Sequence, residues 1–522
     1  MLQRPTPALP PLAGIAQALG MPLGVPFSAD TRLYELIGEA VQGLLVESFS
    51  AREALSEPFE YRLHVLSPDA HLDLQALLGQ RASLAIALPD GSRTTRTGLI
   101  TQAAVLHGDG GLARYELTLR PWLAALQLMV RSQSFIDKSV VEIIDALLQP
   151  YAHLAAWQWA PCVGEHLGRA RRHYCNQYRE TDYAFLARLL AEEGIGWRCE
   201  EDQGAPSGHR IVFFAASAAQ PEDPASQRDG GIRFHRASSQ EDSDTIQAFT
   251  HAQRLRPAVY TLTDWHYLGK RSRAASTPTR GPLGAAPHLE HYDSGAAADH
   301  AGSPDGFDAA RYSRLAAEAH EAHSRHHEGL STARSLRPGT RFTLLDAPLE
   351  APLAPGHDSR YFVTALTSAG INNLPKDYSD AIARRLGAAG FSLALPPEVQ
   401  AQAQASGYAN HFCCLDAEQP WRPRLHDHTG ARLNPKPSVH GPQLATVVGP
   451  HGQSRPSGAD EIHTDALGRI QVQFHWQAHA GHAGASRHSI WVRVAQPYAG
   501  PGMGLQFLPR IGQEVLVDFE EL

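Results

Sequence analysis

The stretch AHEAHSRHHEG, residues 319–329, holds the densest group of side chains that could bind a metal ion. On one helix, His320, His323 and His327 would stand at i, i+3 and i+7 of a single face, and imidazoles grouped in this way can ligate zinc. The spacing H-E-x-H is one residue shorter than the H-E-x-x-H of zinc proteases. Glutamate and arginine interleave with the histidines, which favours a solvated, charge-laced helix over 312–328. If the histidines did bind a metal, the protein would belong to a different functional class, the metal-dependent hydrolases, and we keep this as the alternative interpretation.

Four carboxylates could form an acid–base group, namely Glu180, Asp182, Glu192 and Glu193, but the positions of the last three have a simpler explanation. Asp182 stands in the first turn of an expected helix, where the dipole favours an anion, whereas Glu192 and Glu193 stand near its end, where it does not. That last pair could be held by cations from elsewhere. The sequence has no phosphate-binding G-x-x-x-x-G-K-[ST], no G-x-G-x-x-G entering a helix and no G-x-S-x-G elbow. We therefore predict no catalytic residues and no cofactor.

His475 and Trp476 could stack on bases, because OB folds bind single strands through aromatic side chains. Against this, the formal net charge is −8, and the block around them lacks the basic stripe that a phosphate backbone requires. Trp476 also continues the alternation of Ile470, Val472 and Phe474. It is predicted to be a core residue, and no nucleic-acid partner is expected.

Composition bounds the class of protein. At 522 residues, with 43% hydrophobic and 19% charged residues, the chain can fill the cores of about three domains. Five cysteines without a C-x-x-C pair predict reduced thiols in a chain that folds in the cytoplasm. No apolar run reaches the length of a membrane span, and no signal peptide is recognised, so neither stable membrane insertion nor general export is expected. Twenty-eight histidines and a pI near 6.4 predict that the net charge changes sign in mild acid.

Local patterns predict the elements that surround these residues. Residues 29–125 alternate apolar and polar positions between the turns PDGS and GDGG, which is typical of antiparallel strands. In DKSVVEIIDALLQPY, Ser139 and Glu142 form a capping box at the start of a helix. In YCNQYRETDYAFLARLLAEEGIGW, Thr181 caps a second helix and Gly194 ends it.

These patterns together predict a mainly β fold with α+β elements in four segments. The segments are a Pro/Ala-rich N-terminal extension (1–28), a β-rich region with inserted helices (29–395), an irregular linker (396–440) and a small OB-like β-barrel (441–522). Within the second segment, the Gly-, Ala-, Ser- and Pro-rich stretch 269–309 is expected to be a long surface loop.

The last predicted strand lies close to the end of the sequence. Val515, Val517 and Phe519 alternate onto one face, the pattern of a half-buried strand, and the sequence stops three residues after Phe519. A strand in that position usually leads into a further segment. Phe519 is therefore the point at which we expect such a segment to begin.

Several blocks resemble one family in the expected order. The segment YCNQYRETDYAFLARLLAEEGIGW looks like the signature of the VgrG family, the spike protein of bacterial type VI secretion systems. The blocks WRPRL, PKPSVHGPQLATVVGP, DALGRIQVQFHW and WVRVAQPYAGPGMGLQFLPRIGQEVLVDF are similar to it as well. The resemblance runs from about residue 35 to residue 519, nearly the whole sequence.

The resemblance implies phage tail hub-like β-barrel domains with inserted helices, two barrels in each subunit, followed by an OB-fold domain. Three subunits would form a homotrimer with a pseudo-sixfold ring that sits on a tube of Hcp hexamers. The family continues into a β-helical needle that carries a PAAR tip protein and effectors, and sheath contraction drives the assembly out of the cell into a target. The work is mechanical, so the resemblance implies no catalytic residues.

The family signature gives a set of residues with an expected structural role. They are Tyr174, Gln177, Tyr178, Arg179, Glu180, Asp182, Phe185, Leu189, Glu193, Gly194, Gly468, Phe474, Trp476, Pro509 and Gly512. Substituting Arg179 or Asp182 is expected to impair folding or assembly rather than a catalytic rate. Because the resemblance stops before the needle, two alternatives stay open. The chain could be a needle-less remnant or a phage-type baseplate hub protein.

Overall fold

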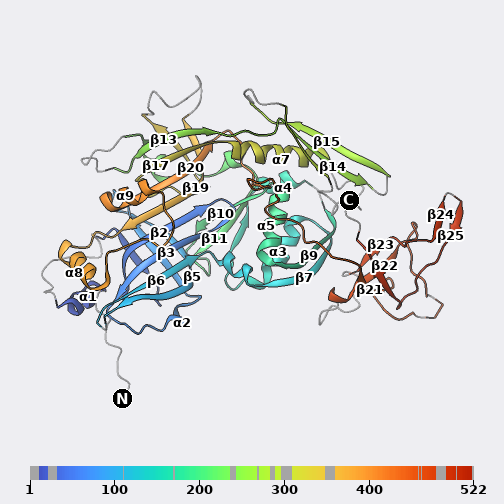
Figure 1. Ribbon diagram of the computed structural model, residues 1–522, viewed down its shortest axis with the longest axis horizontal. Helices are drawn as coiled ribbons and strands as arrows, with labels where there is room; N and C mark the ends of the chain where they lie inside the picture. Colours follow the sequence, from blue (N-terminus) through green and yellow to red (C-terminus); the bar gives the residue numbers. More distant parts are fainter. Residues whose placement is uncertain are drawn as a thin grey trace, which may run out of the picture.

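The fold is given by a computed structural model. It describes residues 11–20, 32–109, 111–168, 171–235, 243–266, 270–281, 288–294, 308–346, 359–456, 458–459, 461–477, 489–500 and 502–519. Figure 1 shows a large body of strands and helices and, beside it, a small body of strands built from the last part of the chain. We call them the hub, residues 11–416, and the collar, residues 443–519. Across the described ranges, no helix is both long and apolar enough to cross a bilayer.

The first half of the hub is the antiparallel sheet that its alternating residues predicted. Its strands are β1 (Tyr34–Ile37), β2 (Leu45–Ala54), β3 (Glu57–Ser67), β4 (Arg81–Ala87), β5 (Arg93–Gly108) and β6 (Ala113–Arg120). They run in the order β1-β4-β5-β6-β3-β2. Leu63 and Val65 of β3, with Leu117 and Leu119 of β6, are fully buried in the core of this half.

The second half of the hub extends the same sheet across β2, which pairs with β19. Its strands are β13 (Ile246–Gln253), β17 (Arg325–Ser331), β19 (Arg360–Ile371) and β20 (Tyr408–Asp416), with β12 (Ile232–Arg233) and β18 (Arg341–Leu345) beside them. Among the described residues the result is one 12-stranded sheet. Since β20 lies inside this sheet and α9 (Pro397–Ser406) packs against it, the irregular linker predicted from residue 396 is wrong over residues 397–416.

A mixed segment with short helices lies between the hub sheet and the collar (Figure 1). It contains β7 (Val130–Lys138), α3 (Val140–Leu148), β8 (Trp157–Trp159), α4 (Cys162–Leu167), β9 (Arg172–Thr181), α5 (Asp182–Glu192), β10 (Gly196–Glu201) and β11 (His209–Phe214). Both predicted caps are confirmed. Ser139 and Glu142 form the capping box of α3, and the Thr181 hydroxyl accepts the amide of Ala184 at the start of α5. Gly194 follows α5 at φ +66°, the left-handed conformation that favours glycine.

The region predicted as a surface loop, 269–309, contains two strands. β15 (Arg271–Pro278) and β16 (Glu290–Ser294) flank β14 (Val259–His266) in a three-stranded sheet, and α7 (Ala309–Ser324) packs on it. The loop prediction is therefore wrong over these strands, while residues 282–287 and 295–307 lie outside the described residues. The predicted helix also ends four residues early, because residues 325–331 form β17.

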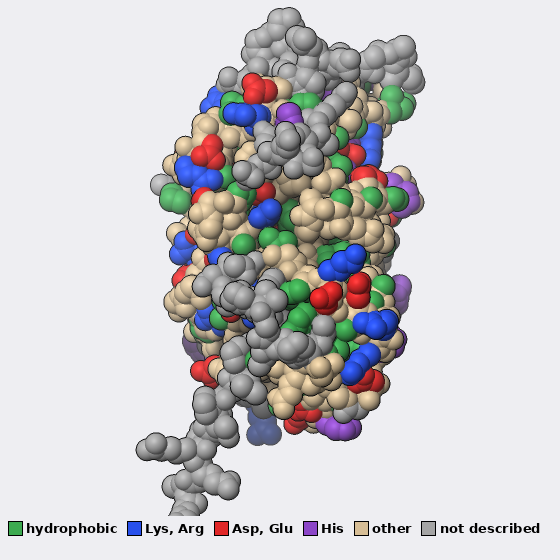
Figure 2. All heavy atoms as spheres, turned by 90° about the vertical axis from the view of Figure 1, so that its left-hand side faces the viewer, with side chains coloured by type: hydrophobic (Ala, Val, Ile, Leu, Met, Phe, Trp, Pro, Cys, Tyr) green, Lys and Arg blue, Asp and Glu red, His purple; other side chains and the backbone are tan. Residues whose placement is uncertain are grey.

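The N-terminal segment is more than an extension. Helix α1 (Pro11–Leu19) buries Ile15, Ala16 and Leu19 against α8 (Lys376–Leu386), which corrects the prediction over these residues. Residues 1–10 and 21–31 lie outside the described residues. Two further short helices are α2 (Leu74–Leu77) and α6 (Pro224–Asp229). Figure 2 shows acidic and basic side chains interspersed over the end of the hub that carries α1 and α8, unlike a nucleic-acid groove.

The collar is a small β structure. Its strands are β21 (Gln443–Val447), β22 (Ile470–Phe474), β23 (Ile490–Val492) and β26 (Glu514–Val517), in the order β23-β22-β21-β26, and a separate hairpin of β24 (Tyr498–Gly500) and β25 (Met503–Leu505). The predicted alternation is confirmed, since Ile470, Val472 and Phe474 are buried together. In β26, Val515 and Val517 pack on this core and Leu516 is 70% exposed.

Candidate functional site

The three histidines predicted as weak metal candidates do not come together. His327 lies on β17, beyond the end of α7, and its Nε2 is 2.9 Å from a carboxylate oxygen of Asp416. The Nε2 of His323 lies 3.2 Å from the carbonyl oxygen of Arg422. Within the described part of the chain, no group of three or more His, Cys, Asp or Glu is arranged to hold a metal ion. The helical spacing fails here because the helix ends at Ser324.

Helix α7 is also not the solvated helix that its polar composition predicted. Ala316, Ala317 and Ala319 are buried, and Tyr260 of β14 packs on the first two. Glu318 is buried as well, and its carboxylate accepts a hydrogen bond of 2.7 Å from the Arg422 guanidinium. Partners distant in sequence thus neutralise charges that the helix, considered alone, was predicted to expose to solvent.

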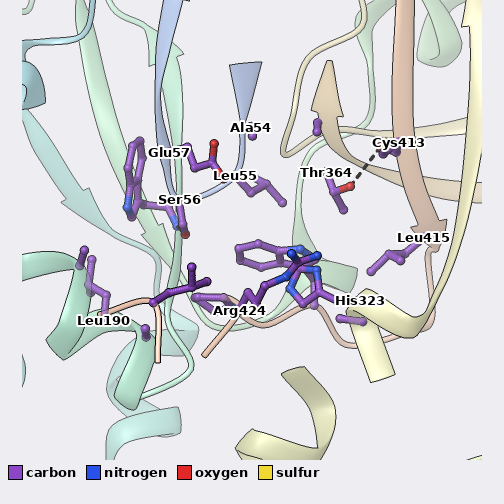
Figure 3. Close-up of a pocket in the computed structure, with 18 of the residues that line it drawn as sticks. Ala54, Leu55, Ser56, Glu57, Leu190, His323, Thr364, Cys413, Leu415 and Arg424 are labelled. Carbon is purple, nitrogen blue, oxygen red and sulfur yellow. Dashed lines mark hydrogen bonds between the residues drawn. The ribbon is translucent and has the colours of Figure 1, made fainter. Parts of the chain in front are cut away.

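A cavity of about 520 Å³ lies in the hub between α5, the turn from β2 to β3, β20 and the chain after β20. Figure 3 shows Glu57, His323, Cys413 and Arg424 around it. Burial raises the pKa of the Cys413 thiol to about 11, so the thiol is protonated at neutral pH. Burial also lowers the pKa of His323 to about 3. Cys413 is therefore not an activated thiolate, and His323 is not tuned to act as a base near pH 7.

Strand β9 presents the signature residues on two opposite faces. Cys175 and Gln177 are fully buried toward the core of the hub, while Tyr174 and Tyr178 alternate onto the other face. This alternation is the ordinary period of a strand. Both tyrosines on the second face make contacts with the collar.

Tyr178 makes the central contact between hub and collar. Its hydroxyl accepts a hydrogen bond of 2.8 Å from Nε2 of Gln443 on β21, and Oε1 of Gln443 accepts one of 2.9 Å from the Trp476 indole. The Tyr178 and Trp476 rings are 5.4 Å apart, and Trp476 stacks on Phe474 at 5.6 Å. Trp476 lies in the turn after β22 and not on the strand, so the predicted alternation ends at Phe474. It is partly buried, packs on the core of the collar and also contacts the hub.

A second contact lies beside the first. Gln477, buried after β22, donates hydrogen bonds to the hydroxyls of Ser134 at 2.6 Å and Tyr174 at 3.2 Å. Ser134 in turn donates to the Asn176 side chain at 2.6 Å, which fixes the acceptor in place. We call this set of contacts from β7 and β9 to β21 and β22 the hub–collar junction. It holds the collar against the side of the hub.

Asp182 supports the junction from inside the hub. Its side chain is fully buried, with Oδ2 accepting from the Tyr151 hydroxyl at 2.7 Å and Oδ1 from Gln177 at 2.7 Å. The Arg131 guanidinium lies 3.2 Å from Oδ2 and compensates the charge. Burial and the bond to Asp182 raise the pKa of Tyr151 to about 12. Asp182 thus orders the start of α5 and the end of β9 together.

Arg179 differs from Asp182, although the two were predicted to act alike. It is exposed, with φ +50°, and its amide donates to the Ser132 hydroxyl at 3.1 Å. Its guanidinium lies 5.4 Å from the Tyr178 ring centroid. The prediction that substituting Arg179 impairs folding or assembly therefore rests on its contact with the Tyr178 ring.

Glu193 is the anchor between α5 and α7. Its carboxylate is 1% exposed and binds the guanidinium groups of Arg172 at 2.9 Å and Arg311 at 2.8 Å, and it accepts from the Tyr312 hydroxyl at 3.0 Å. Glu192 binds Arg172 at 2.7 Å. Arg172 and Arg311 are thus the cations from elsewhere in the chain that could be expected to hold the two glutamates at the end of α5.

Other signature residues serve the packing of the same segment. Phe185 and Leu189 are fully buried in the core around α3 and α5, and Phe185 stacks on Phe135 at 5.7 Å. Glu180 binds Arg188 at 2.7 Å, and burial raises the pKa of its carboxyl. A Cβ at Gly194 would lie 2.9 Å from Leu315 of α7, so glycine permits close packing there.

In the collar, Gly468 and Gly512 occupy turns, and Pro509 lies half-buried before the second of them. The φ angle is +71° at Gly468 and +89° at Gly512, and a Cβ at Gly512 would lie 2.5 Å from the Ser454 carbonyl oxygen. Gly512 therefore requires glycine, and the left-handed backbone at Gly468 favours it.

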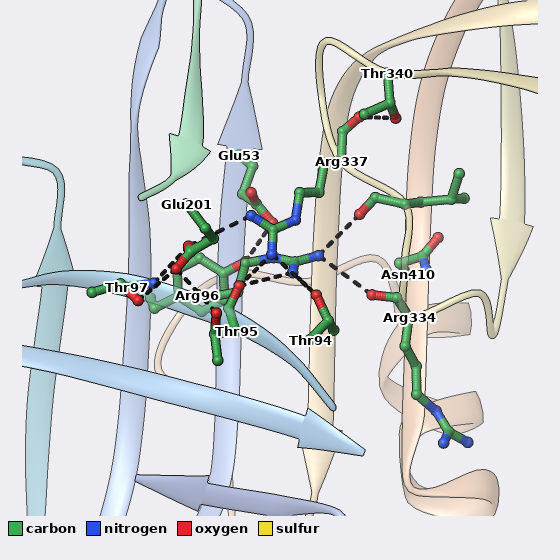
Figure 4. A network of polar contacts seen from close by, with 12 residues as sticks. Glu53, Thr94, Thr95, Arg96, Thr97, Glu201, Arg334, Arg337, Thr340 and Asn410 are labelled. Atoms are coloured by element: carbon green, nitrogen blue, oxygen red, sulfur yellow. Dashed lines mark hydrogen bonds and ion pairs between the residues drawn. The ribbon is translucent and has the colours of Figure 1, made fainter. Parts of the chain in front are cut away.

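A buried arginine network joins the two halves of the hub (Figure 4). Arg96 of β5 donates to the carbonyl oxygen of Leu336 at 3.1 Å and lies 3.4 Å from the Glu53 carboxylate. Arg337, in the same loop as Leu336, donates to the Thr94 hydroxyl at 3.0 Å. The network therefore ties the first half of the sheet to the loop between β17 and β18.

The comparisons with known proteins identify this architecture. Residues 52–374, more than half of the chain, match the family of the phage tail baseplate hub (GPD). The chain belongs to the phage tail baseplate hub family. Residues 459–521 of this hub protein match the OB domain of type VI secretion system and phage-baseplate injectors, which is where the collar lies.

The resemblance to VgrG spike proteins is confirmed by two relatives from Pseudomonas aeruginosa. The type VI secretion system spike proteins VgrG1b and VgrG1a are each 30% identical to this hub protein, over 483 and 497 residues. The matches cover 92% of the hub protein and 57% and 65% of the two relatives. The chain thus spans about three-fifths of the length of these curated relatives.

Solved structures confirm the predicted fold class. The E. coli c3393 protein, described as a component of the type VI secretion system with structural similarity to the T4 bacteriophage tail proteins gp27 and gp5, matches with a TM-score of 0.58 at 19% identity. That match covers 93% of the hub protein and 96% of the other chain. A chain of the half-lidded Francisella PdpA–VgrG complex matches with a TM-score of 0.52 at 9% identity, over 93% of the hub protein and 75% of that chain.

Tyr174, Tyr178 and Trp476 were predicted from the sequence, whereas their partners Gln443 and Gln477 were not. Gln443 is the first residue of β21 and Gln477 follows β22, and nothing in their neighbourhood predicts a contact hundreds of residues away. The available signal was the indole of Trp476, because a packed indole N–H needs an acceptor, but the sequence does not show that this acceptor is Gln443.

We expect Trp476→Ala to loosen the collar of the hub protein. The change removes the ring contacts to Phe474 and Tyr178 and the hydrogen bond to Gln443, which should lower the stability of the collar by about 2–4 kcal/mol. Hydrogen exchange of collar peptides measures this loss. Trp265→Ala, at an exposed position on β14, is the matched control. Equal collar protection in both variants would contradict the assignment of Trp476.

Proposed function

We propose that this protein is the hub and collar of a type VI secretion spike that works as a homotrimer. The observation that carries the proposal is the order of two matches on one chain, a tail hub followed by an injector OB domain. The hub–collar junction supports it further, because it fixes the OB domain to the hub through side chains of both. A rigid connection of this kind suits a part that transmits force.

The proposed partners follow from the relatives named as spike proteins. The trimeric hub would sit on the end of a tube of Hcp hexamers, and a PAAR tip protein and effectors would be carried where a needle is supplied. Its work would be mechanical, with effectors delivered into target cells by contraction, and it would perform no catalysis. Assembly would take place in the cytoplasm, followed by secretion through the type VI apparatus without a signal peptide.

An exposed apolar segment at the start of β7 supports contacts between subunits. Leu128, Met129 and Val130 are consecutive and are 87%, 45% and 60% exposed. Exposed apolar residues that are contiguous mark association surfaces more often than scattered ones do. The segment adjoins β9, because the Asp182 amide donates to the Met129 carbonyl oxygen at 2.9 Å. A neighbouring subunit that covers it would thus lie close to the hub–collar junction.

We expect light scattering of the purified protein to give three times the 56.7 kDa mass of one chain. Val130→Glu should shift the protein toward the monomer, because a charge would be buried in the contact. Leu255→Glu, at a position 71% exposed away from this segment, is the matched control. A monomer at micromolar concentration, or an equal shift in both variants, would contradict the proposed trimer contact.

The type VI role itself is tested by the tube. The trimer should co-sediment with assembled Hcp tubes, and a tagged chain should appear in the medium only when the sheath can contract. A trimer that binds a phage tail tube but not an Hcp tube would instead favour a phage-type baseplate hub.

A further inference from the structure

The chain between β20 and β21 passes α7 and α5 on its way to the collar (Figure 1). Residues 425–433 of this connection fold back on themselves, with the Leu433 amide donating to the Leu425 carbonyl oxygen at 3.0 Å and the Asp427 amide to that of Ala431 at 2.8 Å. We call these residues the linker hairpin. Leu425 packs on Tyr260, Ala316 and Ala317 of the hub.

Three histidine rings from three separate elements lie together where the linker hairpin contacts the hub. His426 belongs to the hairpin, His291 to β16 and His320 to α7. The ring centroids are 4.7 Å apart for His291 and His426, 5.4 Å for His291 and His320, and 6.0 Å for His320 and His426. We call this group the histidine triad. The Tyr260 ring stacks on His291 at 4.5 Å and closes one side of it.

The triad is built for neutral imidazoles. His426 is 8% exposed, and its Nδ1 and the Nε2 of His320 are buried without a hydrogen-bond partner among the residues that the structure describes. Burial lowers the pKa of His320 and of His426 to about 4, and the second cause is repulsion by the neighbouring histidines. Burial likewise lowers the pKa of His291. A protonated ring would gain no hydrogen-bond acceptor among the described residues at these two nitrogens, and the centroids of the three rings lie only 4.7–6.0 Å from one another.

The charged groups that face the triad add to this repulsion. Arg424 faces His320, and Arg432 faces both His291 and His426. Two carboxylates oppose them, but Asp293 is already ion-paired with Arg432. Asp427 accepts hydrogen bonds from Thr429 and Ala431 within the hairpin. Neither carboxylate makes a bond with an imidazole of the triad in the described structure.

We infer that the histidine triad is an acid-operated catch that holds the linker hairpin on the hub at neutral pH and releases it in acid. Docking is complete while the three imidazoles are neutral. A released hairpin exposes them to water, where a histidine takes up a proton near pH 6.5. Acid therefore favours release, and docking weakens by up to about tenfold per pH unit for each imidazole that titrates between pH 6.5 and 4. Release would free the connection to the collar while the hub stays folded.

The test is hydrogen exchange of the full chain between pH 7 and pH 4, with intrinsic exchange rates corrected for pH. Peptides covering residues 425–433 should lose protection at a higher pH than peptides of β3. In His320→Gln and in His426→Gln, the loss should move to lower pH, because one titrating ring is gone. His71→Gln, an exposed histidine of the hub, should leave the profile unchanged.

Three results would overturn the catch. The hairpin could keep its protection down to pH 4, or it could lose protection together with β3, which would be global acid unfolding. The third result is an unchanged hairpin profile in both glutamine variants. Circular dichroism at pH 7 checks that each variant is folded, and His291→Gln serves as a replacement if either is not. None of these outcomes depends on the proposed role in secretion.

Discussion

Replacing Glu193 with alanine is expected to lower the free energy of unfolding by about 3–5 kcal/mol. The carboxylate is 1% exposed and binds two guanidinium groups and a phenol. Without it, Arg311 loses this ion pair while it remains partly buried, and Arg172 loses one of its ion pairs and keeps the one with Glu192. Urea unfolding followed by circular dichroism measures the loss. Because the residue joins α5 to α7, hydrogen exchange should rise first in these two helices.

Two further variants separate the charge from the size of the Glu193 side chain. Glu193→Gln keeps the volume and one acceptor oxygen, so its cost should be smaller than that of alanine but remain well above zero. Glu57→Ala removes one partner of an exposed pair with Arg52 and should cost no more than about 1 kcal/mol. A cost for Glu193→Ala as small as that of Glu57→Ala would disprove the role of Glu193 as an anchor.

The protein is expected to lose stability steeply as the pH falls from 6.5 toward 4. His209, 1% exposed, accepts the Trp122 amide at its Nε2 and has its Nδ1 3.1 Å from the Ser207 carbonyl oxygen, a pair that suits only the neutral ring. Burial lowers the pKa of His209 to about 4 in the folded protein, against about 6.5 when unfolded. The unfolded chain therefore binds the proton first, and by pH 4.5 this one group should remove about 2–3 kcal/mol. His323 acts with the same sign.

The pH dependence is measured by urea unfolding at pH 7 and 4.5 at constant ionic strength. His209→Gln can keep both hydrogen bonds without titrating, so the difference between the two pH values should shrink by about 2 kcal/mol or more. His153→Gln, at an exposed position, should leave the difference unchanged. Equal pH dependence in both variants would show that His209 is not a source of the acid sensitivity.

Much of the hub could be predicted because its signals are local. The strands β2 to β6 alternate between short polar turns, and the caps of α3 and α5 lie within three residues of the groups that they bind. Gly194 ends α5 for a reason that its own backbone angle shows. In each of these cases, the residue and its partner belong to one stretch of sequence.

The errors arose where distant partners decide the outcome. Helix α7 is polar in sequence, yet Glu318 meets Arg422, more than a hundred residues later, and becomes buried. Strand β20 lacks a clean alternation because side chains on both of its faces are buried, so residues 408–416 were mistaken for linker. The histidine triad could not be predicted at all, since its members come from β16, α7 and the linker hairpin.

The hub–collar junction also determines how the molecule responds to a pull along its length. The covalent chain enters the collar from β20, in the second half of the hub, whereas the side-chain contacts bind the collar to β7 and β9 in the segment after the first half. Tension between the two bodies is thus shared by two parallel routes, one through the backbone and one through stacked rings and hydrogen bonds. Shearing the collar off requires breaking the contacts of the second route almost simultaneously, which gives the joint stiffness that a single flexible tether lacks.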